Sequence, residues 1–98
     1  MPKRVYISGA ISGISNYRAR FDKAERKLLS QGYRVINPSC MDDVLINATY
    51  EEYMEADIFL LGMCDSIYML KGWEKSCGAN REYGYALAKG MEIMFERE

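Results

Sequence analysis

The segment of residues 76–82, Ser-Cys-Gly-Ala-Asn-Arg-Glu, holds the residue types best suited to chemistry. Ser76 and Gly78 suit the first turn of a helix, where backbone N–H groups and the helix dipole can bind an anion. A simple N-cap role for Ser76 is the competing interpretation. Glu82 follows roughly 9 Å along such a helix, with alanines beside it on the same face. A partly desolvated carboxylate there could act as a nucleophile on a sugar carbon or as a general base, whereas a helical glutamate is ordinarily a solvated surface residue.

A second acidic side chain, Asp57, lies near the apolar stripe of another expected helix. Burying an unpaired charge is costly, so Asp57 should have a partner or line a cavity. The aromatic residues Tyr6, Tyr17 and Trp73 lie at or near two connections rich in small residues. There they could stack on a base, or they could pack in the core or at its rim.

Composition limits the chemistry and the partners. The chain has 98 residues, which suits a single domain over residues 1–98. It has no histidine, so the commonest metal ligand and the usual neutral-pH base are missing, and we expect neither a metal nor a cofactor. A net charge of −1 provides no positive field for polymeric nucleic acid or a membrane surface.

The three cysteines are odd in number and widely spaced, which predicts neither a disulfide framework nor a zinc site and fits a reducing cytoplasm. The longest apolar run is far too short for a membrane helix, and the start of the chain has no signal-peptide pattern. We therefore expect a cytoplasmic protein.

Strands and helices alternate along the chain. Short runs of β-favouring residues predict strands over residues 5–7, 33–36, 66–70 and 91–95. Helical spacing and stop signals predict helices from residue 17 to Gly32, from 49 to near Gly62, and over 77–89. Asn16 is the expected cap of the first helix, and Thr49 with Glu52 forms a capping box on the second. The apolar faces of the three helices comprise Tyr17, Phe21, Ala24 and Leu28, then Met54, Ile58 and Leu61, then Ala79, Tyr83, Ala86 and Leu87. Residues 39–48 show little periodicity and are expected to be irregular and flexible.

This alternation predicts a small α/β fold of the flavodoxin or Rossmann-like kind, a three-layer sandwich with about four parallel strands in the order 2-1-3-4. The order places a ligand crevice at the carboxyl ends of strands 1 and 3. It is bounded by residues 9–16, with Gly9, Ser12 and Gly13, and by residues 71–76. The first of these loops lacks the glycine pattern of a dinucleotide site and the Gly-Lys-Ser/Thr of a phosphate-binding loop, so we expect neither a nicotinamide cofactor nor a nucleoside triphosphate. Its glycines let a ligand approach the backbone closely, unless they merely make a flexible turn.

Several motifs together resemble the nucleoside 2-deoxyribosyltransferase superfamily, with the closest likeness to a small, largely uncharacterised branch common in bacteria and phages. They are Tyr6-Ile7-Ser8-Gly9, Asn37-Pro38, Ala56-Asp57 with Cys64-Asp65, and residues 78–87, Gly-Ala-Asn-Arg-Glu-Tyr-Gly-Tyr-Ala-Leu. The match runs through nearly the whole chain in order, and residues 82–87 are its most specific part.

The resemblance implies that Glu82 is a nucleophile that attacks the anomeric carbon of a deoxynucleoside and forms a glycosyl-enzyme. It also implies that Tyr6 holds Glu82 or the sugar and that Asp57 assists at the base. The transferases carry an aspartate six residues before the nucleophile, where this sequence has Ser76. The related deoxynucleoside 5′-monophosphate hydrolases use Ser-x-Gly-x-x-x-Glu, the pattern of residues 76–82, in which serine contacts the 5′-phosphate.

The expected function is therefore cleavage of the N-glycosidic bond of a 2′-deoxynucleoside 5′-monophosphate, by hydrolysis or by base transfer. Substrate contacts are expected from Ser8, Gly9, Ser12, Gly13, Trp73, Ser76 and Gly78. The alternatives are a protein of the same fold that binds a nucleotide or nucleotide-derived signal without cleaving it, and a small oligomerising domain with a vestigial crevice. Tyr50, Tyr53, Met54 and Met63 provide spare apolar surface, and the superfamily forms oligomers, so a symmetric homodimer or a larger assembly is expected.

Overall fold

The computed structural model describes residues 2–97, apart from the side chain of residue 42. Its strands are β1 (Arg4–Ser8), β2 (Arg34–Ile36), β3 (Ser66–Met69) and β4 (Glu92–Phe95). Its longer helices are α1 (Tyr17–Ser30), α3 (Tyr50–Gly62) and α4 (Cys77–Ala88), and its shorter ones are η1 (Pro38–Cys40), α2 (Met41–Val44) and η2 (Trp73–Lys75). Each predicted strand and each predicted helix is present, with ends shifted by one or two residues.

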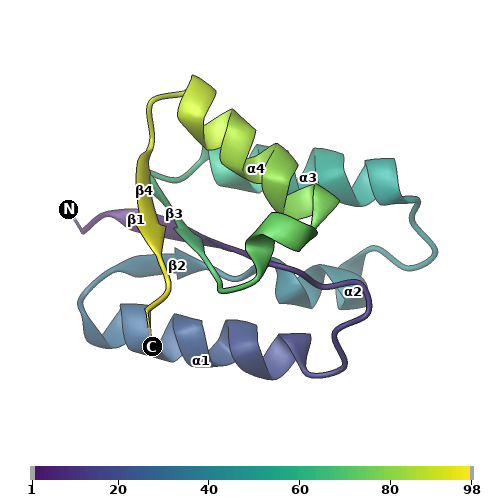
Figure 1. The fold of residues 1–98 in the computed structure, drawn as a ribbon, viewed down its shortest axis with the longest axis horizontal. Coiled ribbons are helices and arrows are strands. Elements are labelled where there is room, and N and C mark those ends of the chain that lie inside the picture. Colours follow the sequence, from purple (N-terminus) through teal and green to yellow (C-terminus); the bar gives the residue numbers. More distant parts are fainter. Residues whose placement is uncertain (1, 98) are drawn as a thin grey trace.

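The four strands form one parallel sheet in the order β2-β1-β3-β4, as the sequence predicts (Figure 1). The register places Tyr6 beside Ile36 on one side and Ile67 on the other. Helix α1 covers one face of the sheet, and α3 and α4 cover the other. From β1 the chain passes through α1 to β2 on one side of β1. It later passes through α3 to β3 on the other side of β1, and through α4 to β4 beyond β3. This reversal creates the switch point at the carboxyl ends of β1 and β3.

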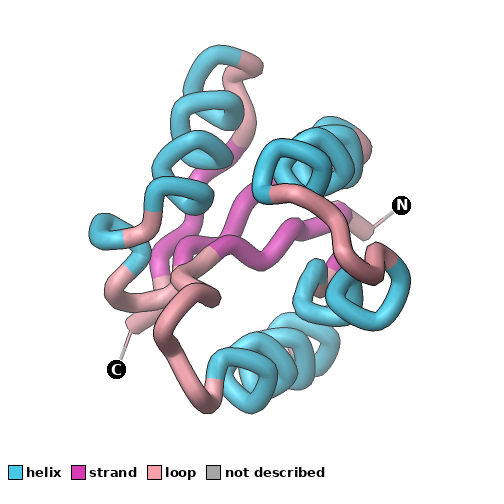
Figure 2. Tube along the Cα trace, turned by 90° about the vertical axis from the view of Figure 1, so that its right-hand side faces the viewer, coloured by secondary structure: helices cyan, strands magenta, loops and turns pink. Residues whose placement is uncertain are grey.

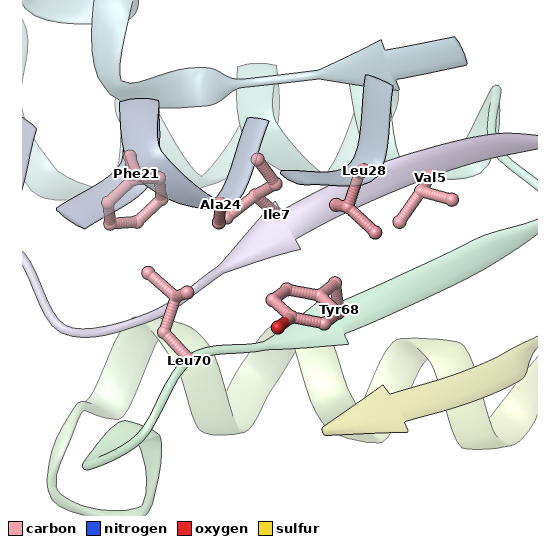
Figure 3. Packing of buried hydrophobic residues seen from close by; sticks show 7 residues of the cluster. All are labelled: Val5, Ile7, Phe21, Ala24, Leu28, Tyr68 and Leu70. Atoms are coloured by element: carbon pink, nitrogen blue, oxygen red, sulfur yellow. The ribbon is translucent and has the colours of Figure 1, made fainter. Parts of the chain in front are cut away.

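Alternation along β1 divides its side chains between two cores. Val5 and Ile7 face α1, where they pack with Phe21, Ala24 and Leu28 (Figure 3). Tyr6 points to the opposite face and joins a second core, which α3 and α4 complete with Leu61, Ala79 and Ala86. Because side chains alternate along a strand, Ser8 shares this second face with Tyr6.

The apolar face predicted for α4 is only partly correct. Ala79 and Ala86 are buried, but Leu87 is 55% exposed and the third buried residue is Glu82. A similar exchange occurs in α3, where Asp57 is buried with Met54 and Leu61 while Ile58 is half-buried. In both helices the apolar stripe therefore includes a carboxylate, which requires a specific environment.

The helix starts differ in how well sequence predicts them. Thr49 and Glu52 form the expected capping box, in which each side chain accepts a hydrogen bond from the other residue's backbone N–H. Asn16 occupies the N-cap position of α1, but its side chain makes no capping hydrogen bond. The prediction for Asn16 is thus right in position and wrong in mechanism.

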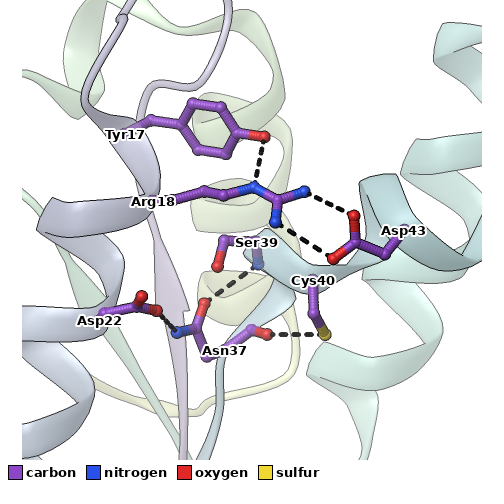
Figure 4. Close-up of polar contacts among 7 residues, drawn as sticks. All are labelled: Tyr17, Arg18, Asp22, Asn37, Ser39, Cys40 and Asp43. Carbon is purple, nitrogen blue, oxygen red and sulfur yellow. Dashed lines mark hydrogen bonds and ion pairs between the residues drawn. The ribbon is translucent and has the colours of Figure 1, made fainter.

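The segment expected to be irregular contains the turn η1 and the short helix α2. The Asn37 side chain accepts a hydrogen bond from the backbone N–H of Ser39 and donates to Asp22 on α1 (Figure 4). Arg18 of α1 binds both carboxylate oxygens of Asp43 at 3.1 Å. These side-chain contacts attach the segment to α1, and they show no periodicity that a sequence pattern could reveal.

Candidate active site

A cavity of about 590 Å³ opens at the carboxyl ends of β1 and β3. Figure 2 looks onto this end of the sheet, where the loops and the N-terminal ends of α3 and α4 gather. Its walls come from the loop after β1, the turn after β2, the inward-facing side of α3 and the start of α4. The predicted location of the crevice is therefore correct.

Glu82 lies in the wall of this cavity and is only 5% exposed. Both of its carboxylate oxygens are held by hydroxyl groups from β1. The Tyr6 hydroxyl donates to Oε2 at 2.6 Å, and the Ser8 hydroxyl donates to Oε1 at 2.6 Å. Because Tyr6 and Ser8 are two residues apart on one strand, they meet the carboxylate side by side and fix its orientation.

Burial is the main influence on the charge of Glu82. Desolvation raises the pKa of this carboxyl group to about 7, although the Ser8 and Tyr6 hydrogen bonds oppose the rise, and the charge of Asp57 adds to it. The pKa of Tyr6 is likewise raised well above its ordinary value, first by burial and then by Glu82. Tyr6 is therefore a neutral hydrogen-bond donor at physiological pH, and Glu82 exchanges its proton near neutrality.

Asp57 lines the same cavity from α3 and is 9% exposed. This position agrees with the expectation that a carboxylate on an apolar stripe should have a partner or line a cavity. The cavity thus contains two carboxylates on neighbouring helices, and their electrostatic coupling appears in the raised pKa of Glu82. Pairs of this kind can divide nucleophilic and proton-transfer roles between them.

The start of α4 forms another part of the wall. The Ser76 hydroxyl accepts the backbone N–H of Ala79 at 3.1 Å, so Ser76 is an N-cap and also lines the cavity with Gly78. Lys75, which sequence reasoning did not single out, lies beside it in the wall. The N-terminus of α4, with its cap Ser76 and the neighbouring Lys75, therefore forms one part of the cavity wall.

The loop after β1 supplies Gly9 and Ser12 to the cavity. Gly9 passes so close to β3 that an added Cβ would lie 2.9 Å from the Cβ of Leu70, which explains why glycine is required there. Neither Ser8 nor Gly13 lines the cavity. Ser8 instead donates its hydrogen bond to Glu82, which does line it. Gly13 has a positive φ of 78°, consistent with a role in the turn.

Trp73 does not line the cavity either. Its ring packs against Tyr83 with the ring centroids 4.6 Å apart, and Phe95 of β4 completes the aromatic cluster. Tyr17 packs edge-on against Phe21 instead of lining the cavity. For both residues the structure supports the packing interpretation and not base stacking.

Among the cavity residues that were not predicted as site residues are Tyr50, Tyr53 and Pro38. The two tyrosines were assigned to spare outer surface together with Met54, yet Met54 is buried and all three face the cavity. Their spacing from Asp57, at four and seven residues, is the signal that places them on its face of the helix.

Two other classes of site, a metal centre and a membrane-spanning helix, have no candidate among residues 2–97, leaving aside the side chain of residue 42. These residues hold no group of three or more His, Cys, Asp or Glu side chains that could bind a metal ion. Among the same residues, no helix is long and apolar enough to cross a membrane.

Comparison with known proteins places the chain in a family. A family model described as "Domain of unknown function (DUF4406)" matches residues 3–95. The chain belongs to this family. No curated protein sequence matches the DUF4406 chain.

A solved structure described as a 2-desoxiribosyltransferase from Leishmania mexicana has a similar fold. The TM-score is 0.74 and the sequence identity 22%, and the match covers 96% of the DUF4406 chain. The chain spans 63% of the length of that protein. The likeness shows that the two proteins share an α/β fold.

Proposed function

We propose that the DUF4406 chain cleaves the N-glycosidic bond of a 2′-deoxynucleoside 5′-monophosphate, with Glu82 as the nucleophile. The observation that carries the proposal is the buried Glu82 carboxylate in a cavity wall, held by the hydroxyls of Tyr6 and Ser8. A carboxylate needs such fixed orientation and partial desolvation to attack carbon. The fold likeness to a deoxyribosyltransferase supports the same reaction class.

The reaction takes place in two steps. In the first, a Glu82 carboxylate oxygen bonds to C1′ of the deoxyribose while the C1′–N bond breaks, and the electron pair leaves with the base. The Asp57 carboxyl group donates the proton that the departing base requires. In the second step water attacks C1′, gives its proton to the Asp57 carboxylate, and releases Glu82 as a carboxylate. A second base in place of water would give transfer, and we favour hydrolysis.

The start of α4 supports a monophosphate as substrate. Ser76 and Gly78 line the cavity at a helix N-terminus, where backbone N–H groups and the helix dipole favour an anion. Lys75 adds a positive charge at the same place. A nucleoside would bring only a neutral 5′-hydroxyl group to this end.

Incubation with a panel of deoxynucleoside monophosphates, followed by chromatography for free base and 2-deoxyribose 5-phosphate, tests the proposal. The matched control is Glu82→Gln, which keeps the size of the side chain and removes the nucleophile. We expect base release by the native chain and none by the variant. Nucleotide binding without base release would instead support a non-catalytic binding protein.

We further propose that the protein works in the reducing cytoplasm as a homo-oligomer, at least a dimer. Its three cysteines are free thiols in the structure, as that compartment requires. Phe59 on α3 and Met63 directly after it provide exposed apolar surface.

A further inference from the structure

The two tyrosines of the cavity wall have different surroundings. The Arg81 guanidinium group lies over the Tyr50 ring, with its Cζ atom 5.7 Å from the ring centroid. Arg81 also donates hydrogen bonds to the Glu51 carboxylate. A Cβ added at Gly78 would lie 3.6 Å from the Tyr50 hydroxyl oxygen, so Tyr50 reaches the start of α4. Tyr50 therefore belongs to the end of the cavity that contains Ser76.

Tyr53 is held by a different contact. Its hydroxyl donates a hydrogen bond to the backbone carbonyl of Leu45, in the connection between α2 and α3. This bond and partial burial hold the ring in place while one part of it lines the cavity. Tyr53 also precedes Asp57 by four residues on α3, so the ring and the carboxylate are neighbours on one helix face.

Pro38 adds a second rigid apolar group from the turn after β2. It is buried and lines the cavity, and the Asn37 side chain fixes its turn by accepting the Ser39 N–H. Asn37 is in turn anchored to Asp22 and Glu25 of α1. Tyr53 and Pro38 thus offer a preformed apolar wall with little conformational entropy to lose on binding.

The contacts proposed for the phosphate and the sugar limit where the base can lie. In a deoxynucleoside monophosphate, C1′ lies between the phosphate and the base. With the phosphate at Ser76, C1′ at Glu82 and Asp57 as the donor to the departing base, the base lies beside Asp57, against the part of the cavity wall that α3 forms. We propose that Tyr53 is a specificity-determining residue whose ring contacts the base, an inference that rests on the proposed function.

Binding to an inactive background separates this contact from catalysis. The probes are a deoxynucleoside monophosphate and 2-deoxyribose 5-phosphate, which lacks the base. Calorimetry gives the dissociation constant of each probe for Glu82→Gln alone and combined with Tyr53→Leu. Loss of base stacking should weaken nucleotide binding about tenfold or more and leave 2-deoxyribose 5-phosphate binding unchanged.

Two variants control for indirect effects. Phe59→Leu removes an aromatic ring from the same helix outside the cavity, where Phe59 is 71% exposed, and should change neither constant. Tyr53→Phe keeps the ring and removes only the bond to Leu45, so it should weaken nucleotide binding less than Tyr53→Leu. Thermal unfolding establishes that each variant is folded, and Tyr53→Met replaces Tyr53→Leu if the latter does not fold.

The outcomes distinguish the two proposals. Equal weakening of both probes, or no change in either, would overturn the role of Tyr53 while base release by the native chain upholds the proposed function. Failure of the native chain to bind or cleave any nucleotide would overturn both.

Discussion

At the scale of single residues, Glu82 determines what the site can do. A carboxyl group with an ordinary pKa would be fully ionised at neutral pH, whereas burial brings the pKa of Glu82 to about 7. The hydroxyls of Tyr6 and Ser8 limit this rise, because hydrogen bonds to the carboxylate favour its charged form. The burial that would favour the proposed attack by Glu82 thus also lowers the fraction of Glu82 that is ionised.

This balance predicts the pH dependence of the proposed reaction. Only the carboxylate form of Glu82 can attack C1′, so kcat/KM should rise with pH as Glu82 ionises, with a midpoint near 7. Tyr6→Phe removes a hydrogen bond that lowers the pKa of Glu82, so it should move the midpoint to higher pH. Initial rates of base release between pH 5 and 9 provide the measurement. A profile with no rise in kcat/KM between pH 5 and 7 would be incompatible with a carboxylate nucleophile at this position.

The same group should affect stability. The pKa of Glu82 is about 7 in the folded chain and near 4.5 when unfolded, so between these values the folded state binds more protons. The free energy of unfolding should therefore fall as pH rises from about 4.5 to 7, by about 3 kcal/mol, and this contribution should stay constant above 7. Urea unfolding of the native chain and of Glu82→Gln, at pH 5 and pH 8, measures it. A pH dependence that is identical in the two proteins would contradict the assignment.

At the scale of elements, the N-terminal ends of α3 and α4 build the site. Both helices begin at the carboxyl edge of the sheet, and both have side-chain caps, Thr49 and Ser76. A firmly capped first turn fixes the residues that line the cavity. Helix α1, which lies on the opposite face and has no side-chain cap, carries little of the cavity wall.

The caps predict a difference between two conservative substitutions. Thr49→Ala removes the capping box and should lower the free energy of unfolding by about 1 kcal/mol. Asn16→Ala is the matched control, because the Asn16 side chain makes no capping bond, and it should change stability by less than about 0.5 kcal/mol. Chemical denaturation measures both values. Equal losses would show that the contacts at the two helix starts are not as described.

The proposed phosphate contact of Ser76 would link the start of α4 to substrate choice. Ser76→Asp preserves the cap, since aspartate is an equally good N-cap residue, but it places a negative charge where the phosphate is proposed to bind. We expect kcat/KM for monophosphates to fall about tenfold or more, and that for the corresponding nucleosides to fall much less. Parallel assays of dAMP and deoxyadenosine make the comparison. An equal loss on both substrates would place the phosphate elsewhere.

At the scale of the whole molecule, periodicity predicted the fold and the switch point well. Alternation along β1 and helical spacing around Phe21, Ala24 and Leu28 depend on local geometry, and they fix the three layers. The placement of Trp73 and Tyr53 could not be predicted in this way. An aromatic residue near a loop can face the cavity or a neighbouring ring, and the docking of α3, α4 and β4 decides which. The buried face of α4 consists of Ala79, Glu82 and Ala86, and Leu87 lies outside it and is exposed. Spacing alone had assigned Leu87 to this face because it counted only apolar residues.

The outer surface predicts self-association. Phe59, Met63 and Leu87 are large apolar residues with about half or more of their surface exposed on α3, after α3 and on α4. A symmetric dimer would bury such surface, and the net charge of −1 opposes association only weakly. Sedimentation velocity should give twice the mass of 11.3 kDa. A monomer at micromolar concentration would refute the prediction.

The central claim concerns the bond between C1′ and the base, and release of that base is its most direct test. Chromatography of reactions with deoxynucleoside monophosphates should show free base and 2-deoxyribose 5-phosphate in equal amounts with the native chain. Glu82→Gln, folded by its thermal unfolding curve, should release none. Base release that persists in Glu82→Gln, or its absence from the native chain, would contradict the account.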